Sequence, residues 1–285
     1  MSTGHSGKRF EFGRNWQRFV KHNFNEDRLN VAQKHILEFT GRCDLTGFDF
    51  LDIGCGSGLH SYAASRAGAR RILSFDCDAS SVRATMALRK HAGEPENWTV
   101  AQGDVLDDAY VDRLGTWSFV YSWGVLHHTG DMWRALRNAQ KTVADNGLLY
   151  VALYSSDVQP DKEFWLDVKR TYNRSNALKK QAMVYWYIWN YGMGKDIKRL
   201  PAVANQILTY RFKRGMNYFT DVRDWLGGWP MEFAADQDAV DFLEGEHGFK
   251  LVNVATGHAN SEFLFQRTGS PAGRTVVTAM VAEKR

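Results

Sequence analysis

The first part of the sequence contains a glycine-rich turn and three carboxylates, each of which lies in or directly after a short apolar stretch. Asp52 lies within a short apolar stretch, Asp76 ends the next such stretch, and Asp104 follows the third. Glycines alternate with other residues over 54–58, where they let the backbone approach a ligand closely. A carboxylate about 20 residues beyond such a turn accepts hydrogen bonds from a ribose diol. These residues indicate a nucleotide-like ligand, and a dinucleotide-binding enzyme would share the turn and the second carboxylate.

Two adjacent histidines, His127 and His128, follow the fourth apolar stretch. The imidazole group has an ordinary pKa near neutrality, so either side chain can take a proton from an attacking hydroxyl group. We therefore expect one of them to be a general base. The alternative is a structural role, in which a histidine caps the following helix or hydrogen-bonds within the fold.

Alternating apolar segments position these residues. Strands are expected at 49–54, 71–76, 98–103, 117–122 and 147–154, with helices at 59–68, 79–91, 107–114 and 131–144. The last helix is predicted to stop at the pair Asn146 and Gly147, a C-cap signal. This order predicts an α/β fold, a Rossmann-like, doubly wound parallel sheet of about seven strands that binds ligands at the carboxyl ends of its strands.

The segments on either side of this core differ from it. Residues 10–40 are expected to form two helices that cap the sheet, or that close over a ligand through Trp16. Residues 156–232 are predicted to be helical and to form a lid, followed by a helix at 238–244 and strands at 249–255, 262–266 and 275–281. The predicted division is a cap at 1–45, a core at 46–155, a lid at 156–232 and the rest of the sheet at 233–285.

The composition narrows the classes of protein to consider. The 285 residues are 44% hydrophobic and 24% charged, with a net charge of +4, which is ordinary for one elaborated globular domain. So mild a charge does not by itself indicate nucleic acid. We expect no signal peptide and no membrane span. The three cysteines have no metal-ligand spacing, which favours the reducing cytoplasm and no metal site.

The glycines follow the pattern Gly-x-Gly-x-Gly, not Gly-x-Gly-x-x-Gly. The segment 52–58 resembles the first motif of class I S-adenosylmethionine-dependent methyltransferases. Residues 75–78 resemble that family's second motif, 103–105 its adenine-edge motif and 119–128 its fourth. The resemblance covers about residues 45 to 155, and it implies S-adenosylmethionine as cofactor and S-adenosylhomocysteine as product.

The resemblance also implies a role for each matching residue. The turn and Asp52 would lie beside the methionine part of the cofactor, with the carboxylate near its ammonium group. Asp76 would bind the ribose hydroxyls and Cys77 would flank the adenine, whose amino group would donate to Asp104. With Trp16 added from the cap, the predicted cofactor-binding residues are Trp16, Asp52, Gly54, Cys55, Gly56, Gly58, Asp76, Cys77, Asp104, Val105 and Ser122.

Two departures from related motifs narrow the reaction. Enzymes that methylate amino groups of nucleobases often carry Asn/Asp/Ser-Pro-Pro-Tyr/Phe after the fourth strand, where this chain has 122–125, Ser-Trp-Gly-Val. Ubiquinone-type O-methyltransferases that bind a metal carry acidic residues there, where this chain has Gly124 and His127. The first difference argues against a base-modifying enzyme of that type, and the second argues against a metal site built from carboxylates.

The predicted lid is the basic and aromatic part of the chain. Residues 162–214 contain twelve Lys or Arg against three Asp or Glu. They either form a solvated basic face over an aromatic seam, or attract an anionic acceptor. A membrane surface, single-stranded RNA and a second copy of the chain are further alternatives. The predicted substrate contacts are Tyr154, Arg214, Tyr218, Asp221, Trp225 and His258, together with Asp224.

The sequence thus predicts a methyltransferase that acts on an oxygen of a small or carrier-linked, anionic metabolite, with His127 or His128 as base. A looser likeness of the segment 214–233 to methyltransferases of bacterial glycan and secondary-metabolite clusters ranks such acceptors first. A methyltransferase that docks on RNA or protein is the alternative enzyme. A cofactor-binding scaffold without catalysis is the alternative of another class.

Overall fold

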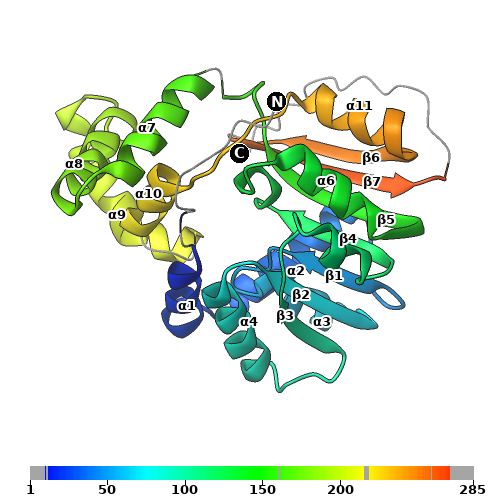
Figure 1. Ribbon diagram of the computed structural model, residues 1–285. Helices are drawn as coiled ribbons and strands as arrows, with labels where there is room; N and C mark the ends of the chain where they lie inside the picture. The colour runs from blue at the N-terminus through cyan, green and yellow to red at the C-terminus, as the bar shows by residue number, and fades with distance from the viewer. Residues whose placement is uncertain (1–9, 11, 160, 215–217, 258, 270–285) are drawn as a thin grey trace.

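The computed structural model of the chain describes residues 10, 12–159, 161–214, 218–257 and 259–269, with side chains described outside 211–214. Its centre is one seven-stranded sheet in the order β3-β2-β1-β4-β5-β7-β6 (Figure 1). The strands are β1 (Asp49–Ile53), β2 (Arg71–Asp76), β3 (Trp98–Gln102), β4 (Trp117–Trp123), β5 (Val143–Tyr154), β6 (Phe249–Thr256) and β7 (Asn260–Arg267). The first five run parallel, whereas β7 runs antiparallel to both of its neighbours. The α/β fold class predicted from the alternation is confirmed.

Helices cover both faces of this sheet. Those of the core are α1 (Gly13–His22), α2 (Glu26–Thr40), α3 (Leu59–Arg66), α4 (Ala79–His91), α5 (Asp108–Asp112), α6 (Met132–Lys141) and α11 (Asp236–His247). An apolar cluster under α2 and α3 fills one face, and a second cluster under α6 and α11 fills the other. All five residues of β1 are buried, which explains its continuous apolar pattern.

Short polar side chains begin several of these helices. Asn25, Asp78 and Asp131 each accept a hydrogen bond from a backbone N–H in the first turn of α2, α4 and α6. Such caps satisfy donors that the helix itself leaves unpaired. Because α4 begins directly after β2, its cap also lies at the carboxyl end of the sheet, beside Asp76.

The segment between β5 and α11 forms a separate group of helices, here called the helical insertion (residues 162–227). It consists of α7 (Lys162–Arg174), α8 (Ala177–Tyr187), a π-helical turn (Ile188–Gly192), a 3-10 turn (Ile197–Arg199), α9 (Leu200–Arg214) and α10 (Tyr218–Gly227). The insertion has its own apolar cluster, built around Trp165, Val184 and Leu226. Figure 1 shows it beside the sheet, at the left, with α1 below it.

The predicted junction between the helix at 131–144 and the strand at 147–154 is wrong. The helix expected over 131–144 ends at Lys141, and β5 begins at Val143. Asn146 has φ +59°, but it lies within an irregularity of β5, where the pairing with β4 shifts between Trp117 and Phe119. The Asn-Gly signal therefore marks a strand bulge and not a helix end. The strand expected at 275–281 lies outside the described residues.

Candidate active site

The glycine turn follows β1 and depends on the absence of side chains. Gly54, Gly56 and Gly58 have φ of +75°, +56° and +80°, which L-residues with side chains rarely adopt. A Cβ on Gly54 would lie 2.3 Å from a methyl carbon of Val125. The N–H of Gly54 donates to the carbonyl of Phe75 at 2.8 Å, which fixes the turn against the end of β2. The sequence therefore needs glycine here for packing as well as for conformation.

Asp76 joins this turn to the start of α4. Its carboxylate accepts the N–H of Gly56 at 3.1 Å and the N–H of Asp78 at 2.9 Å. Burial raises the pKa of Asp76 above its ordinary value, against these two hydrogen bonds, which lower it. The carboxylate thus lies at the edge where β1 and β2 end, and this position fits the predicted contact with ribose hydroxyls.

Asp52 lies deeper, in the buried interior. The hydroxyl of Ser61 donates to its carboxylate at 2.5 Å. Ser61 lies 2.6 Å from the hydroxyl of Ser74, which accepts the indole N–H of Trp98 at 2.7 Å. Desolvation raises the pKa of Asp52 to about 7. Since Ser61 already donates to this carboxylate, a contact between Asp52 and a cofactor stays a prediction.

The remaining predicted cofactor residues surround the same edge. The N–H of Gly103 donates to the carbonyl of Asp76 at 3.1 Å, which brings the end of β3 beside β2. Asp104 accepts the N–H of Leu106 at 2.9 Å, and Val105 is buried. The other three residues make hydrogen bonds at the same edge. The carbonyl of Cys77 accepts from the side-chain amide of Gln102, and the sulfur of Cys55 accepts from the hydroxyl of Thr85. The hydroxyl of Ser122 donates to the carbonyl of Ile53.

Helix α1 lies on this turn. A Cβ on Gly56 would come within 3.1 Å of Nε1 of Trp16, so the indole covers the glycine. The N–H of Gly13 donates to the carboxylate of Asp78 at 2.9 Å. The same helix also reaches the insertion, because the side-chain amide of Asn15 donates to Asp224 at 2.5 Å. Helix α1 therefore connects the predicted cofactor edge to α10.

His127 lies in the short 3-10 turn Leu126–His128 after β4 and is 1% exposed. The backbone N–H of Tyr154 donates to its Nδ1 at 3.1 Å. Because Nδ1 accepts, the neutral ring carries its proton on Nε2. Burial, followed by the charges of His128 and Lys169, holds the pKa of His127 well below its ordinary value. Its ring is thus neutral, and the nitrogen that could accept a proton is engaged.

His128 has the opposite arrangement. Its Nδ1 lies 2.7 Å from the carbonyl oxygen of Pro230, which can only accept, so Nδ1 donates. The lone pair of the neutral ring then belongs to Nε2. The ring of Phe12 lies 5.2 Å away, and a Cβ on Gly228 would come within 3.2 Å of Cε1. The imidazole is half-buried and oriented by contacts from three distant parts of the chain, Phe12, Tyr154 and residues 228–230.

Among the predicted substrate residues, Tyr154 ends β5 beside the histidines, whereas Tyr218, Asp221, Asp224 and Trp225 lie on α10 of the insertion. The ring of Tyr154 is 4.0 Å from that of His127 and 5.9 Å from that of Trp225. Burial raises the pKa of Tyr154, and burial with the neighbouring Asp221 raises that of Asp224 to about 7. Asp221 accepts a hydrogen bond from Tyr210, whose ring packs at 5.0 Å on Tyr218.

Two predicted substrate residues are not placed. The side chain of Arg214 and all of His258 lie outside the described residues. Conversely, sequence reasoning missed Asn15, Lys169 and Pro230. No spacing rule points to them, because each acts through a partner between 56 and 209 residues away.

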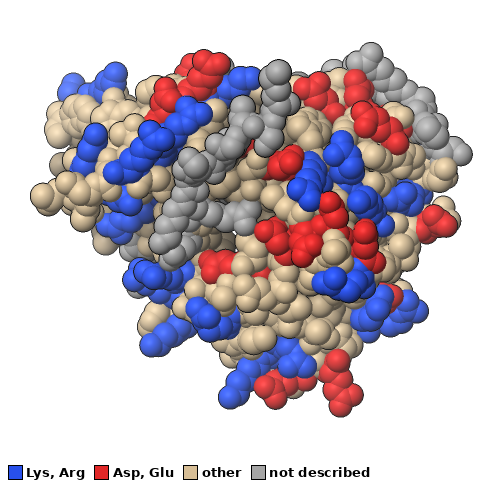
Figure 2. Space-filling model, viewed as in Figure 1, with Lys and Arg blue, Asp and Glu red and all other residues tan. Residues whose placement is uncertain are grey.

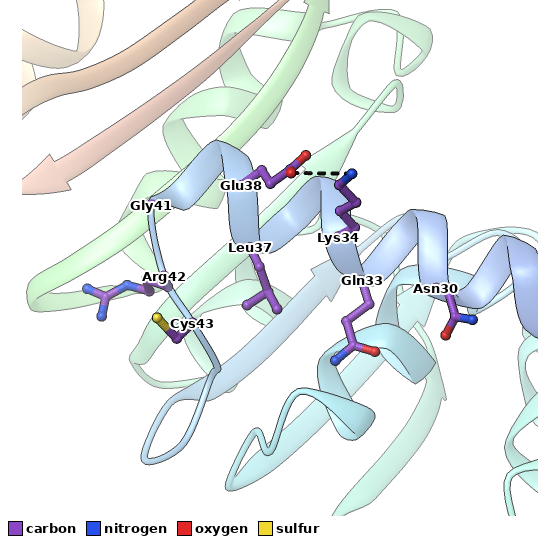
Figure 3. Close-up of a pocket in the computed structure, with 8 residues that line it drawn as sticks. All are labelled: Asn30, Gln33, Lys34, Leu37, Glu38, Gly41, Arg42 and Cys43. Carbon is purple, nitrogen blue, oxygen red and sulfur yellow. Dashed lines mark ion pairs between the residues drawn. The ribbon is translucent and has the colours of Figure 1, made fainter.

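A pocket of about 430 Å³ lies elsewhere, at the C-terminal end of α2 (Figure 3). Figure 3 shows Leu37, Arg42 and Cys43 on its wall, and an ion pair of 3.6 Å between Lys34 and Glu38. The residues after α2 lead into the start of β1, so this pocket lies far from the glycine turn along that strand. In the described part of the chain, no three His, Cys, Asp or Glu side chains gather as a metal site would need. None of the described helices has the length and apolar character of a membrane span.

A family model described as a methyltransferase domain matches residues 18–233. The chain belongs to this methyltransferase family. The match runs from α1 through the cofactor edge and the whole helical insertion. It confirms the class I, S-adenosylmethionine-dependent methyltransferase inferred from the motifs, together with the cofactor.

Curated relatives of this methyltransferase match less than half of its residues. The ubiquinone biosynthesis O-methyltransferase of Rhizobium rhizogenes is 31% identical over 136 residues, which are 46% of this chain and 53% of the relative. A tRNA U34 carboxymethyltransferase of Methylococcus capsulatus is 33% identical over 84 residues, 30% of this chain and 25% of the relative. The chain spans about half the length of the ubiquinone-type relatives it matches.

Solved structures support the fold. Magnesium protoporphyrin IX methyltransferase from Synechocystis, crystallised with S-adenosylhomocysteine, has a TM-score of 0.51 at 12% identity. The alignment covers 90% of this chain and 94% of that one. A methyltransferase from Anabaena variabilis has a TM-score of 0.53 at 11% identity, with 92% and 98% covered. Both likenesses concern the fold alone.

Proposed function

We propose that this methyltransferase transfers a methyl group to a hydroxyl oxygen of a small or carrier-linked metabolite, with His128 as the general base. The observation that carries the proposal is the hydrogen bond between Nδ1 of His128 and the carbonyl of Pro230 at 2.7 Å. A base needs its acceptor nitrogen oriented and its proton-bearing nitrogen held, and this bond does both. His127 would then act as a positioning residue, since its Nδ1 accepts from Tyr154.

The cofactor-holding residues fit the same proposal. The glycine turn would admit the methionine part, and Asp76 and Asp104 would bind ribose and adenine. S-adenosylmethionine supplies a methyl group that its sulfonium has already activated. The protein must therefore hold the acceptor in line, exclude water and remove one proton. Trp16, Phe12 and Tyr154 are the aromatic groups available to exclude water around that edge.

The choice of oxygen as the acceptor atom has two supports. One is the activity for which the Rhizobium relative is named, O-methylation, although its alignment stops short of half of this chain. The other is the need for a base, because hydroxyl acceptors lose a proton during transfer and a held imidazole can take it. Reaction in the cytoplasm, transient contact with a membrane surface and dimer formation remain predictions from the sequence.

The test uses a substitution that keeps the hydrogen bond and removes the base. His128→Gln keeps an amide that can donate to Pro230 but has no basic nitrogen. With a panel of phenols, hydroxy acids and sugars, release of S-adenosylhomocysteine by His128→Gln should fall about 10²- to 10⁴-fold at neutral pH. Affinity for S-adenosylhomocysteine should stay within about two-fold of wild type, since the change leaves the turn intact.

Full turnover by His128→Gln would overturn the assignment of the base. Mass spectrometry of the methylated product checks the acceptor atom, because a nitrogen or carbon product would contradict O-methylation. His127→Asn is the comparison variant. It should lower turnover together with thermal stability, because its ring packs on Tyr154 and is fully buried.

A further inference from the structure

Lys169 differs from the other cations of the helical insertion. Lys162, Arg170, Lys179 and Lys198 are exposed, and Figure 2 shows basic side chains over the outer surface on that side. Lys169, on α7, is 1% exposed and is the only Lys or Arg among the described residues that is buried. The excess positive charge that the sequence places in this segment is therefore of two kinds, an outer set in water and one cation inside.

The surroundings of Lys169 do not neutralise it. Its ammonium group donates to the backbone carbonyl of Trp225 and lies 4.4 Å from the centre of the Trp225 ring. No carboxylate in the described part of the chain is within 4.0 Å of Nζ. An ammonium has three N–H donors, and a buried charge without a counter-ion costs several kcal/mol. Desolvation lowers the pKa of Lys169 to about 7, in agreement with this environment.

A second donor beside it is also unpaired. The indole Nε1 of Trp225 is buried and has no hydrogen-bond partner among the described residues. Buried N–H groups in folded proteins are nearly always paired, by protein, water or ligand. Because Nζ lies over the same indole ring, the two donors are within a few ångströms of each other. They would share one oxygen-bearing group.

These donors lie on the acceptor side of the site. The ring of Tyr154 is 5.9 Å from that of Trp225 and 4.0 Å from that of His127. The charge of Lys169 also contributes to the lowered pKa of His127. A ligand held by Lys169 would thus lie next to the histidine turn, where the acceptor belongs.

We propose that Lys169 and the indole N–H of Trp225 bind an anionic oxygen group of the acceptor, a carboxylate or a phosphate ester. This subsite rests on the proposed function and adds the chemical class of the acceptor to it. The sequence predicted only that the basic segment as a whole attracts an anionic acceptor, whereas this subsite assigns the contact to two specific donors. The rings of Tyr154 and Trp225, 5.9 Å apart, offer an aromatic surface beside these donors to an anion attached to a ring.

The competing explanation is purely structural. The last carbonyls of α10 have no donor within the helix. The side-chain amide of Asn173 donates to one of them, the carbonyl of Gly227, at 2.8 Å. Lys169 could serve the carbonyl of Trp225 in the same way. An amide or a hydroxyl would do that without a buried charge, and a purely structural role leaves the indole N–H unpaired. The two explanations therefore differ in what they predict for ligands.

The test measures binding by calorimetry to the full chain with S-adenosylhomocysteine present. The probes are benzoate and phenyl phosphate, compared with the neutral benzamide and benzyl alcohol. We expect at least one anion to bind about ten-fold or more tightly than both neutral probes. Lys169→Met should remove this difference, and Trp225→Phe should reduce it about three- to ten-fold while keeping the ring. Preference between the two anions distinguishes a carboxylate from a phosphate ester.

Lys180→Met is the matched control. Lys180 also lies over an aromatic ring of the insertion, 5.4 Å from the centre of Tyr172, but is only half-buried. It should leave the preference for the anion unchanged. The proposal is wrong if wild type binds benzoate and phenyl phosphate no better than the neutral probes, or if Lys169→Met weakens all four equally. If Lys169→Met fails to fold, an unchanged preference in Trp225→Phe overturns the proposal in its place.

This readout is independent of turnover. Loss of methyl transfer in His128→Gln concerns the base, whereas anion binding is measured without any reaction. A chain that binds the anions through Lys169 but methylates no acceptor would therefore contradict the proposed function and leave the subsite in place.

Discussion

The edge of β1 to β3 and the helical insertion hold their polar groups in different ways. At the edge, the N–H groups of Gly56 and Asp78 reach Asp76 across 20 and two residues of sequence. At the insertion, Asn15 reaches Asp224 across 209 residues, and just beyond its C-terminal end His128 reaches Pro230 across 102. The first region is a local motif on a strand, turn and helix. The second exists only once the whole chain has folded, and substitutions in both regions test this difference.

The largest effect is expected at the glycine turn. Gly54→Ala forces a side chain onto φ +75° and places its Cβ 2.3 Å from a methyl of Val125. Together the strain and the overlap should lower the free energy of unfolding by about 4 kcal/mol and weaken binding of S-adenosylhomocysteine. Urea unfolding measures the first and calorimetry the second. The control is Gly115→Ala, at φ +65° with no atom within 4 Å of its Cβ, which should cost only the strain. An equal loss of unfolding free energy in the two variants would show that Val125 moves aside and that the overlap costs nothing.

A buried carboxylate of the same region should make stability depend on pH. Asp52 has a pKa of about 7 in the folded chain, against an ordinary value of 3.8, so between pH 4 and 7 the unfolded chain loses this proton while the folded chain keeps it. The free energy of unfolding therefore falls as pH rises through this window, by about 3 kcal/mol in all. Asp52→Asn should remove the part of the slope that Asp52 contributes, while the parts from Asp76 and Asp224, whose pKa values are also raised, should remain. Urea titrations at several pH values compare the variant with wild type, and parallel slopes would contradict the assignment.

A smaller effect is expected where the two regions meet. Asn15→Leu removes the amide that donates to Asp224 and so unties α1 from α10. The free energy of unfolding should fall by about 1 to 2 kcal/mol. Hydrogen exchange should accelerate in α10 and not at Gly56. The comparison variant Asn173→Leu cuts a contact inside the insertion, to the carbonyl of Gly227. If Asn15→Leu also accelerated exchange at the glycine turn, the two regions would form one cooperative unit.

The smallest effects are expected for exposed ion pairs, in either region. Arg134 pairs with Asp108 at 2.8 Å in the core, and Arg170 pairs with Asp167 at 2.8 Å in the insertion. Solvent screens both pairs, so Arg134→Ala and Arg170→Ala should each shift the melting temperature by less than about 1 °C. A clear shift for Arg170→Ala alone would show that the outer charges of the insertion stabilise it.

The difference between local contacts at the strand edge and long-range contacts at the insertion also explains which features could be predicted from the sequence. The bounds predicted for β2 and α4 agree with the structure, because apolar spacing and the cap Asp78 are local signals. Asn146 misled the prediction, since a residue with positive φ marks a helix end and a bulge equally well. The partners of His128 and Lys169 could not be predicted, because no local pattern specifies which distant carbonyl a side chain will meet.

The order of the strands has a consequence for synthesis on the ribosome. β5 pairs with β4 on one side and with β7 on the other, and β7 is made only after the entire insertion. While residues 155–259 are being translated, the apolar strand β5 has an open edge, which is a template for pairing with other chains. The insertion has its own apolar cluster and can become compact during that interval. A nascent chain stalled before Asn260 should therefore aggregate more readily than the complete, folded chain.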